Sequence, residues 1–123
     1  MLRTAAVSIF VTVTLAVSCG STAPTGPGET AERMLEAAQA HDYDLMRSFF
    51  SPEAQSEINE AALAGIEIIS FSIDEIDYSN DSIEVEIDYT ITIKEIGSGE
   101  TDTDDEDMDM ELNSDGEWII VDL

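Results

Sequence analysis

One segment of this chain alternates apolar and polar residues without a break, and it restricts the fold more than any other feature. Across residues 82–94 every second position is apolar: Ile83, Val85, Ile87, Tyr89, Ile91 and Ile93. The intervening positions carry acids, threonines and one lysine. Successive side chains of a β-strand point to opposite faces of the sheet. The pattern therefore predicts a strand with one face in a hydrophobic core and the other in water.

Three further strands are predicted around this segment. They span residues 66–78, 103–112 and 118–123, with turn-forming residues at 79–81, 97–99 and 113–116. The alternation in residues 66–78 slips at Ile68-Ile69 and again near Asp74-Glu75. Slips of this kind indicate β-bulges, which bend a strand. Short turns between consecutive strands favour an antiparallel arrangement.

The region before the strands has helical periodicity. Residues 29–41 place Ala31, Met34, Leu35 and Ala38 on one face of a helix, and Thr30 is a candidate cap. Residues 43–50 predict a short second helix, whose inward residues we expect to be Leu45, Met46, Phe49 and Phe50. A third helix is predicted from Ser51-Pro52 to Ala64, ending at Gly65. Helices followed by antiparallel strands indicate the α+β class.

The amino-terminal residues have the features of a secretory signal. Arg3 precedes an apolar run that is too short to span a bilayer, and small residues lead to Cys19, the only cysteine. The segment resembles the lipobox of bacterial and archaeal lipoproteins, which implies that Cys19 carries acyl chains such as palmitate. We therefore expect a signal peptide at residues 1–18, a lipidated cysteine with a flexible tether at 19–28, and one domain at 29–123.

This arrangement predicts a protein outside the cytoplasm that is anchored to the membrane through Cys19. Its location would be the cell surface or, in a diderm bacterium, the outer membrane facing the periplasm. All 28 acidic residues follow the cysteine, and the whole chain has a net charge of −24. Such a chain repels nucleic acid. The acids are spread over every segment, which favours adaptation to a salt-rich (halophilic) environment over one selective cation site.

Three short sequences together suggest a family. The first predicted helix ends in Ala-His-Asp (40–42), Phe-Phe-Ser-Pro-Glu (49–53) leads into the next helix, and Asp-Gly-Glu-Trp-Ile-Ile (115–120) precedes the end. The combination resembles small secreted lipoproteins of the nuclear-transport-factor-two-like superfamily. The resemblance implies a cone, in which the helices pack in the concave face of a curved four-stranded antiparallel sheet. It also implies an apolar pocket at one end of the cone, and its members include isomerases, dehydratases and proteins without known activity.

The first functional hypothesis is a non-catalytic domain that binds a small apolar ligand or a protein partner. No acid or base is predicted on the inward face of the long strand, and no cofactor motif is present. We expect the pocket to include Phe49, Phe50, Val85, Ile87 and Tyr89. The alternative is an isomerase or dehydratase that uses Tyr89 with Asp42 or His41. For His41, termination of a helix is the simpler interpretation.

The third hypothesis is a surface module that binds divalent cations weakly. Residues 100–111 hold eight carboxylates, of which Asp102, Asp104 and Glu106 match alternate positions of a calcium loop. Asp107 stands where such a loop requires glycine, and Asn113 where it requires a bidentate glutamate. A solvated acidic hairpin is the simpler interpretation. Because the outer sheet face would carry like charges, we also expect a monomer at low salt.

Overall fold

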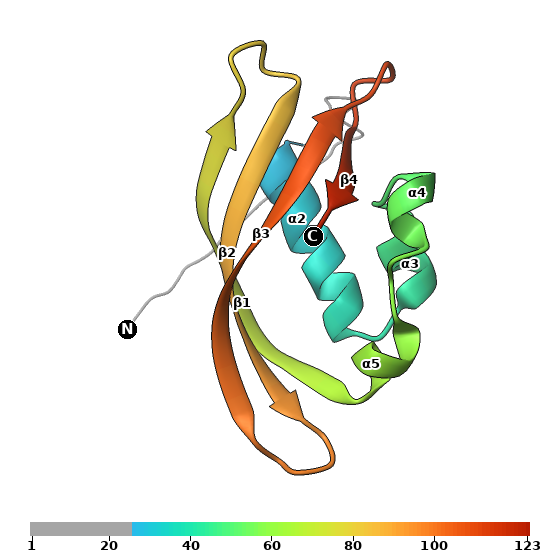
Figure 1. Ribbon diagram of the computed structural model, residues 1–123, viewed down its shortest axis with the longest axis vertical. Helices are drawn as coiled ribbons and strands as arrows, with labels where there is room; N and C mark the ends of the chain where they lie inside the picture. The colour runs from blue at the N-terminus through green and yellow to red at the C-terminus, as the bar shows by residue number, and fades with distance from the viewer. Residues whose placement is uncertain (1–25) are drawn as a thin grey trace, which may run out of the picture.

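The computed structural model describes residues 26–123, in which four helices lie on one face of a four-stranded sheet (Figure 1). The strands are antiparallel neighbours in chain order, so the predicted α+β class and sheet are confirmed. The elements are α2 (Pro27–Gln39), α3 (Tyr43–Arg47), α4 (Pro52–Gln55), α5 (Glu60–Ala64), β1 (Ile66–Tyr78), β2 (Glu84–Glu95), β3 (Thr101–Leu112) and β4 (Trp118–Asp122).

The sheet is strongly curved, and the helices occupy its concave side (Figure 1). The register between β1 and β2 shifts between Ile68 and Ser70 and again between Ile73 and Glu75. These are the two places where the sequence predicted bulges. Each bulge adds a residue to one strand only, which bends that strand and increases its twist. The curvature in β1 therefore has a cause that was visible in the sequence.

The hydrophobic core lies between α2 and the concave face of the sheet. Met34 on α2, Ile87 on β2 and Met108 on β3 are each no more than 1% exposed. Ile83 was predicted to point inward, but this was wrong, because β2 begins at Glu84 and Ile83 is 49% exposed. It lies in the turn beside Ser82, whose φ of 61° is left-handed.

Helix α2 begins two residues earlier than predicted. Gly26 is its N-cap and Pro27 occupies the first helical position, where the missing N–H costs no hydrogen bond. Residues 27–28 therefore belong to the helix rather than to the tether. Thr30 is not the cap. It lies buried inside the first turn, where its Oγ1 donates to the Gly26 carbonyl oxygen at 3.1 Å.

The end of α2 is a Schellman motif. The His41 N–H donates to the Ala38 oxygen at 3.1 Å, and the Asp42 N–H donates to the Ala37 oxygen at 2.9 Å. His41 has a φ of 59°, the left-handed conformation that this motif requires. Histidine is among the residues that adopt it more readily. The helix-terminating interpretation of His41 is thus what the backbone shows.

The region predicted as one helix over residues 52–64 forms two. The side chain of Ser51 caps α4, and the Asn59 Oδ1 accepts from the Ala62 N–H at 3.1 Å to start α5. An asparagine that bonds the backbone in this way favours a new helix start over continuation. The expected inward position of Leu45 was also wrong, since it is 49% exposed on α3.

Backbone hydrogen bonds join the segment between α3 and α4 to the last strand, β4. The Ile120 N–H donates to the Phe49 oxygen and the Ser51 N–H donates to the Ile120 oxygen, both at 2.9 Å. The two bonds form an isolated parallel bridge between Phe50 and Ile120. This contact closes the concave side at the β4 edge.

Within residues 26–123, no helix has the length and the apolar character needed to cross a membrane.

Candidate ligand-binding site

Burial decreases along the concave face from one end to the other. On β2, Val85, Ile87 and Tyr89 are buried, whereas Ile91 and Ile93 are only half-buried. On β3 the change is larger, because Met108 and Met110 are fully buried while the residues before them are exposed. Phe71 and Ile73 of β1 are also half-buried. Apolar side chains that touch the core yet remain accessible are candidates for contact with a ligand.

A row of carboxylates borders this apolar surface on the same face. Residues directly opposite one another in antiparallel strands share a face. The pairs are Tyr89 with Glu106, Ile91 with Asp104, and Ile93 with Asp102. We call Asp102, Asp104 and Glu106 the concave acidic row.

Side-chain hydrogen bonds place the alternate residues of β3 on the other face. The Thr90 hydroxyl donates to Asp105 at 3.0 Å, and the hydroxyls of Thr92 and Thr103 lie 2.9 Å apart. Thr90 and Thr92 alternate with the inward residues of β2, so these contacts lie on the convex side. The concave acidic row is thus separate from the convex carboxylates of the same strand.

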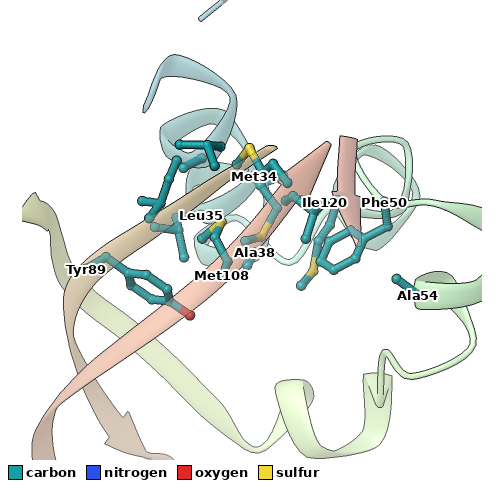
Figure 2. Close-up of a cluster of buried hydrophobic side chains, with 14 of the residues drawn as sticks. Met34, Leu35, Ala38, Phe50, Ala54, Tyr89, Met108 and Ile120 are labelled. Carbon is teal, nitrogen blue, oxygen red and sulfur yellow. The ribbon is translucent and has the colours of Figure 1, made fainter. Parts of the chain in front are cut away.

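Tyr89 lies where the buried part of the concave face meets the half-buried part. It is 7% exposed and stands at one end of the core cluster, with Phe50 and Ala54 at the other (Figure 2). Burial raises the pKa of Tyr89 to about 12, and the charges of Glu106 and Asp107 add to the shift. Within residues 26–123 its hydroxyl makes no hydrogen bond to another side chain or to the backbone. Buried phenols usually find a partner, so the lack of one among residues 26–123 makes this hydroxyl a candidate for ligand contact.

The side chains of His41 and Asp42, the proposed catalytic partners of Tyr89, both contact backbone atoms of neighbouring elements. The His41 Nε2 lies 3.2 Å from the Ile66 oxygen, and the His41 ring is 5.9 Å from that of Tyr43. The Asp42 Oδ1 accepts from the Leu45 N–H at 3.2 Å and caps α3. Both side chains are exposed. Neither side chain forms a hydrogen bond with Tyr89 in the described part of the chain. The contacts of His41 and Asp42 are those of residues that end one helix and begin the next.

The other predicted pocket residues lie at different depths. Phe50, Val85 and Ile87 are no more than 4% exposed and belong to the core. Phe49 is half-buried beside it. A ligand contacts accessible atoms, so the half-buried residues are the better candidates for direct contact. Sequence reasoning missed Phe71, Ile73, Ile91 and Ile93 as candidates, although Ile91 and Ile93 continue the alternation of Val85 and Ile87.

The convex face of the sheet is densely acidic. Two hollows of about 430 and 570 Å³ lie over it. Acidic residues are five of the ten that line the first and six of the seven that line the second, where Glu106 and Tyr89 also contribute. Two groups of carboxylates have oxygens within 4.8 Å of one another: Glu75, Asp77 and Asp88, and Glu86, Asp88 and Asp107. Asp102, Asp104 and Glu106 belong to neither group. They lie on a regular strand, not in a loop of the calcium-binding kind.

Crowding on the convex face makes a testable contribution to stability. Asp107 and Asp88 raise the pKa of Glu86 above its ordinary value of 4.5. Folding therefore favours the protonated form of Glu86, and the ionised form destabilises the fold as the pH rises through that pKa. We expect Glu86→Gln to raise the melting temperature at pH 7 and low salt. The advantage shrinks below pH 4.5 and in about 1 M salt, where the screening length falls to roughly 3 Å.

The matched control for this measurement is Glu57→Gln, which removes one exposed carboxylate outside the sheet. Both variants change the net charge equally. If charge crowding on the sheet is the cause, Glu86→Gln gives the larger gain. Equal gains would show that only the total charge of the chain matters.

Solved structures share this architecture, whereas no protein-family model and no curated protein matches the chain. A SEC-C motif containing protein from Rhodopseudomonas palustris has a TM-score of 0.65 at 11% identity, over 78% of this chain and 75% of that one. A nuclear-transport-factor-two-like protein of unknown function from Shewanella oneidensis has a TM-score of 0.54 at 19% identity, over 76% and 90%. A Mycobacterium tuberculosis protein in complex with estradiol-17beta-hemisuccinate has a TM-score of 0.56 at 14% identity, over 76% and 88%.

At these identities the likeness concerns the fold alone. The chain has the nuclear-transport-factor-two-like cone that the resemblance of its short motifs implied. Folds of this kind carry many functions, so the activity must be argued from the site.

Proposed function

We propose that this domain binds a small apolar ligand on its concave face, outside the cytoplasm, and that a lipid on Cys19 holds it at the membrane. The ligand rests against Phe71, Ile73, Ile91 and Ile93, with the Tyr89 hydroxyl at the inner end. Phe50, Val85 and Ile87 belong to the buried core and not to this surface. In this proposal the domain binds its ligand without catalysing a reaction.

One observation carries the proposal: apolar side chains that pack against the core remain half-exposed around a buried phenol without a partner in the described chain. Water is a poor environment for such side chains, and a ligand that covers them is stabilised by the area removed from water. The hydroxyl then gains a hydrogen bond, which would fix the orientation of the ligand. The Mycobacterium tuberculosis protein of similar fold was solved in complex with estradiol-17beta-hemisuccinate, and this supports the idea that a domain of this fold can bind a small, largely apolar molecule.

Binding of an uncharged environment-sensitive dye tests the apolar half of this proposal. N-butyl dansylamide should increase in fluorescence with the wild-type protein and saturate. Ile91→Gln should weaken binding of the dye by about tenfold. A tenfold change in affinity corresponds to about 1.4 kcal/mol, roughly half of the free energy gained when an isoleucine side chain is fully removed from water. The control, Thr92→Gln, changes the adjacent residue on the convex face and should leave binding unchanged. Equal losses in the two variants, or no saturable binding at all, would reject the proposal.

The lipid anchor concerns residues outside the described part of the chain, and it rests on the lipobox-like sequence before Cys19. We expect metabolic labelling with an alkyne fatty acid to mark the wild-type protein and not Cys19→Ser. The variant should appear in the soluble extracytoplasmic fraction, because retention by two acyl chains is lost. Ser18→Thr, which leaves the thiol in place, serves as the control. Unlabelled wild-type protein in the soluble fraction would contradict the anchor.

A further inference from the structure

We propose that the concave face selects cationic ligands: molecules with an apolar body, a positively charged group and a hydrogen-bond acceptor for Tyr89. The inference rests on the proposed function and specifies its ligand. The apolar body covers Ile91 and Ile93, and the charged group meets the concave acidic row. The acceptor takes the Tyr89 O–H.

The first support is the position of the acidic row relative to the apolar surface. Each of its three carboxylates stands directly opposite an apolar or aromatic residue of the site: Asp102 opposite Ile93, Asp104 opposite Ile91, and Glu106 opposite Tyr89. Neighbours in such pairs have Cβ atoms about 5 Å apart. A ligand that lies on Ile91 and Ile93 is therefore within reach of the carboxylates.

The second support is that the described chain supplies no cation for this row. Its ion pairs use Arg33 with Glu29 and Arg47 with Asp44 and Glu60, all on the helices. Lys94, the single basic residue of the strands, occupies a position that alternates with Ile93 and so points to the convex side. A positive group on a ligand would give the carboxylates a counter-charge that the fold lacks.

The third support is the Tyr89 hydroxyl. It is buried, it belongs to the face that carries the row, and it makes no hydrogen bond within residues 26–123. Because its pKa is high, it stays protonated and donates at any physiological pH. A buried donor opposite Glu106 distinguishes this row from carboxylates that only keep a surface hydrated, and it points to a bound molecule.

General acidity is the competing explanation, since acids occur throughout the chain. Strand β3 offers a matched test of it. Asp104→Asn/Glu106→Gln removes two charges from the concave side, and Asp105→Asn/Asp107→Asn removes two from the convex side of the same strand. Net charge and local sequence change almost identically in the two variants. Only the position relative to the apolar surface differs.

Three dansyl probes with similar apolar bodies provide the measurement: cationic dansylcadaverine, neutral N-butyl dansylamide and the anionic dansyl derivative of 5-aminovaleric acid. At low salt we expect the cation to bind on the order of tenfold more tightly than the neutral probe, since several exposed charge pairs contribute modestly each. The anion should bind most weakly. Asp104→Asn/Glu106→Gln should abolish this order of affinities, whereas Asp105→Asn/Asp107→Asn should preserve it. Tyr89→Phe should weaken all three probes and keep their order.

Three results would overturn the inference. Equal affinity of the cationic and neutral probes in the wild type would show that the row does not select charge, while the proposed apolar site would stand. The same loss of preference in both double variants would assign the effect to general acidity. Failure of all three probes to bind would reject the inference together with the proposed function. Circular dichroism of each variant identifies any loss that comes from unfolding.

Discussion

Replacing Ile87 by alanine is expected to lower the free energy of unfolding by about 3 kcal/mol, within the 2–5 kcal/mol typical of buried isoleucines. Ile87 is 0% exposed and lies in one core cluster with Met34 of α2 and Met108 of β3. Truncation removes apolar contact and leaves a cavity that a curved sheet with a helix across it cannot easily close. Chemical denaturation monitored by circular dichroism gives the value.

Ile83→Ala is the matched control, because it makes the same chemical change four residues earlier. Ile83 is 49% exposed, so its truncation should alter stability by no more than about 0.5 kcal/mol. Both measurements are best made at high salt, where the acidic chain repels itself least. Losses of equal size would mean that the two side chains are equally buried, contrary to the assignment of β2.

The difference between Ile83 and Ile87 shows how far the sequence determined the fold. Alternation with a period of two identifies a strand and its buried face, because side chains of a strand point alternately to its two sides. It does not mark where the strand ends. That point depends on the turn at residues 79–83, where the Ser79 N–H donates to the Glu84 oxygen at 2.9 Å. The bulges of β1 were predictable for the same reason as the strand, since each interrupts the alternation.

The short helices were less predictable than the strands. Residues 52–64 have helix-forming composition throughout, yet Asn59 caps a new helix within them. Helices of one turn have little stability of their own and form where tertiary contacts place them. Leu45 is exposed for a related reason: α3 has five residues, too few for periodicity to define an inward face.

The acidic row illustrates what the sequence alone could not assign. Asp102, Asp104 and Glu106 match the spacing of a calcium loop and equally the spacing of one strand face. Reading the alternation backwards from Met110 and Met108 places them on the concave side, and that signal was present in the sequence. Their neighbours Ile91 and Ile93, however, follow only from the register of β2 against β3. The site is therefore a property of the pairing, not of either strand.

Phe50→Ala is expected to have the largest effect of any single substitution considered, a loss of about 3–5 kcal/mol. Phe50 is 4% exposed and its backbone forms the bridge to Ile120, so one residue joins the helical segment to β4. A domain of about 100 residues has a total stability of roughly 5–15 kcal/mol. The variant should therefore be partly unfolded near physiological temperature, and thermal unfolding measures the change.

Two companion variants, which both keep the backbone bridge, test whether the buried ring of Phe50 is the cause. Phe50→Leu keeps most of the buried volume and should recover most of the stability, because large apolar replacements are tolerated better than truncation. Phe49→Ala truncates the neighbouring half-buried ring, whose carbonyl makes the 2.9 Å bond to Ile120, and should cost clearly less. If Phe49→Ala and Phe50→Ala were equally damaging, the depth at which each ring is buried would not determine the loss. If Phe50→Ala alone is severe, the buried ring holds the concave side closed at its β4 edge.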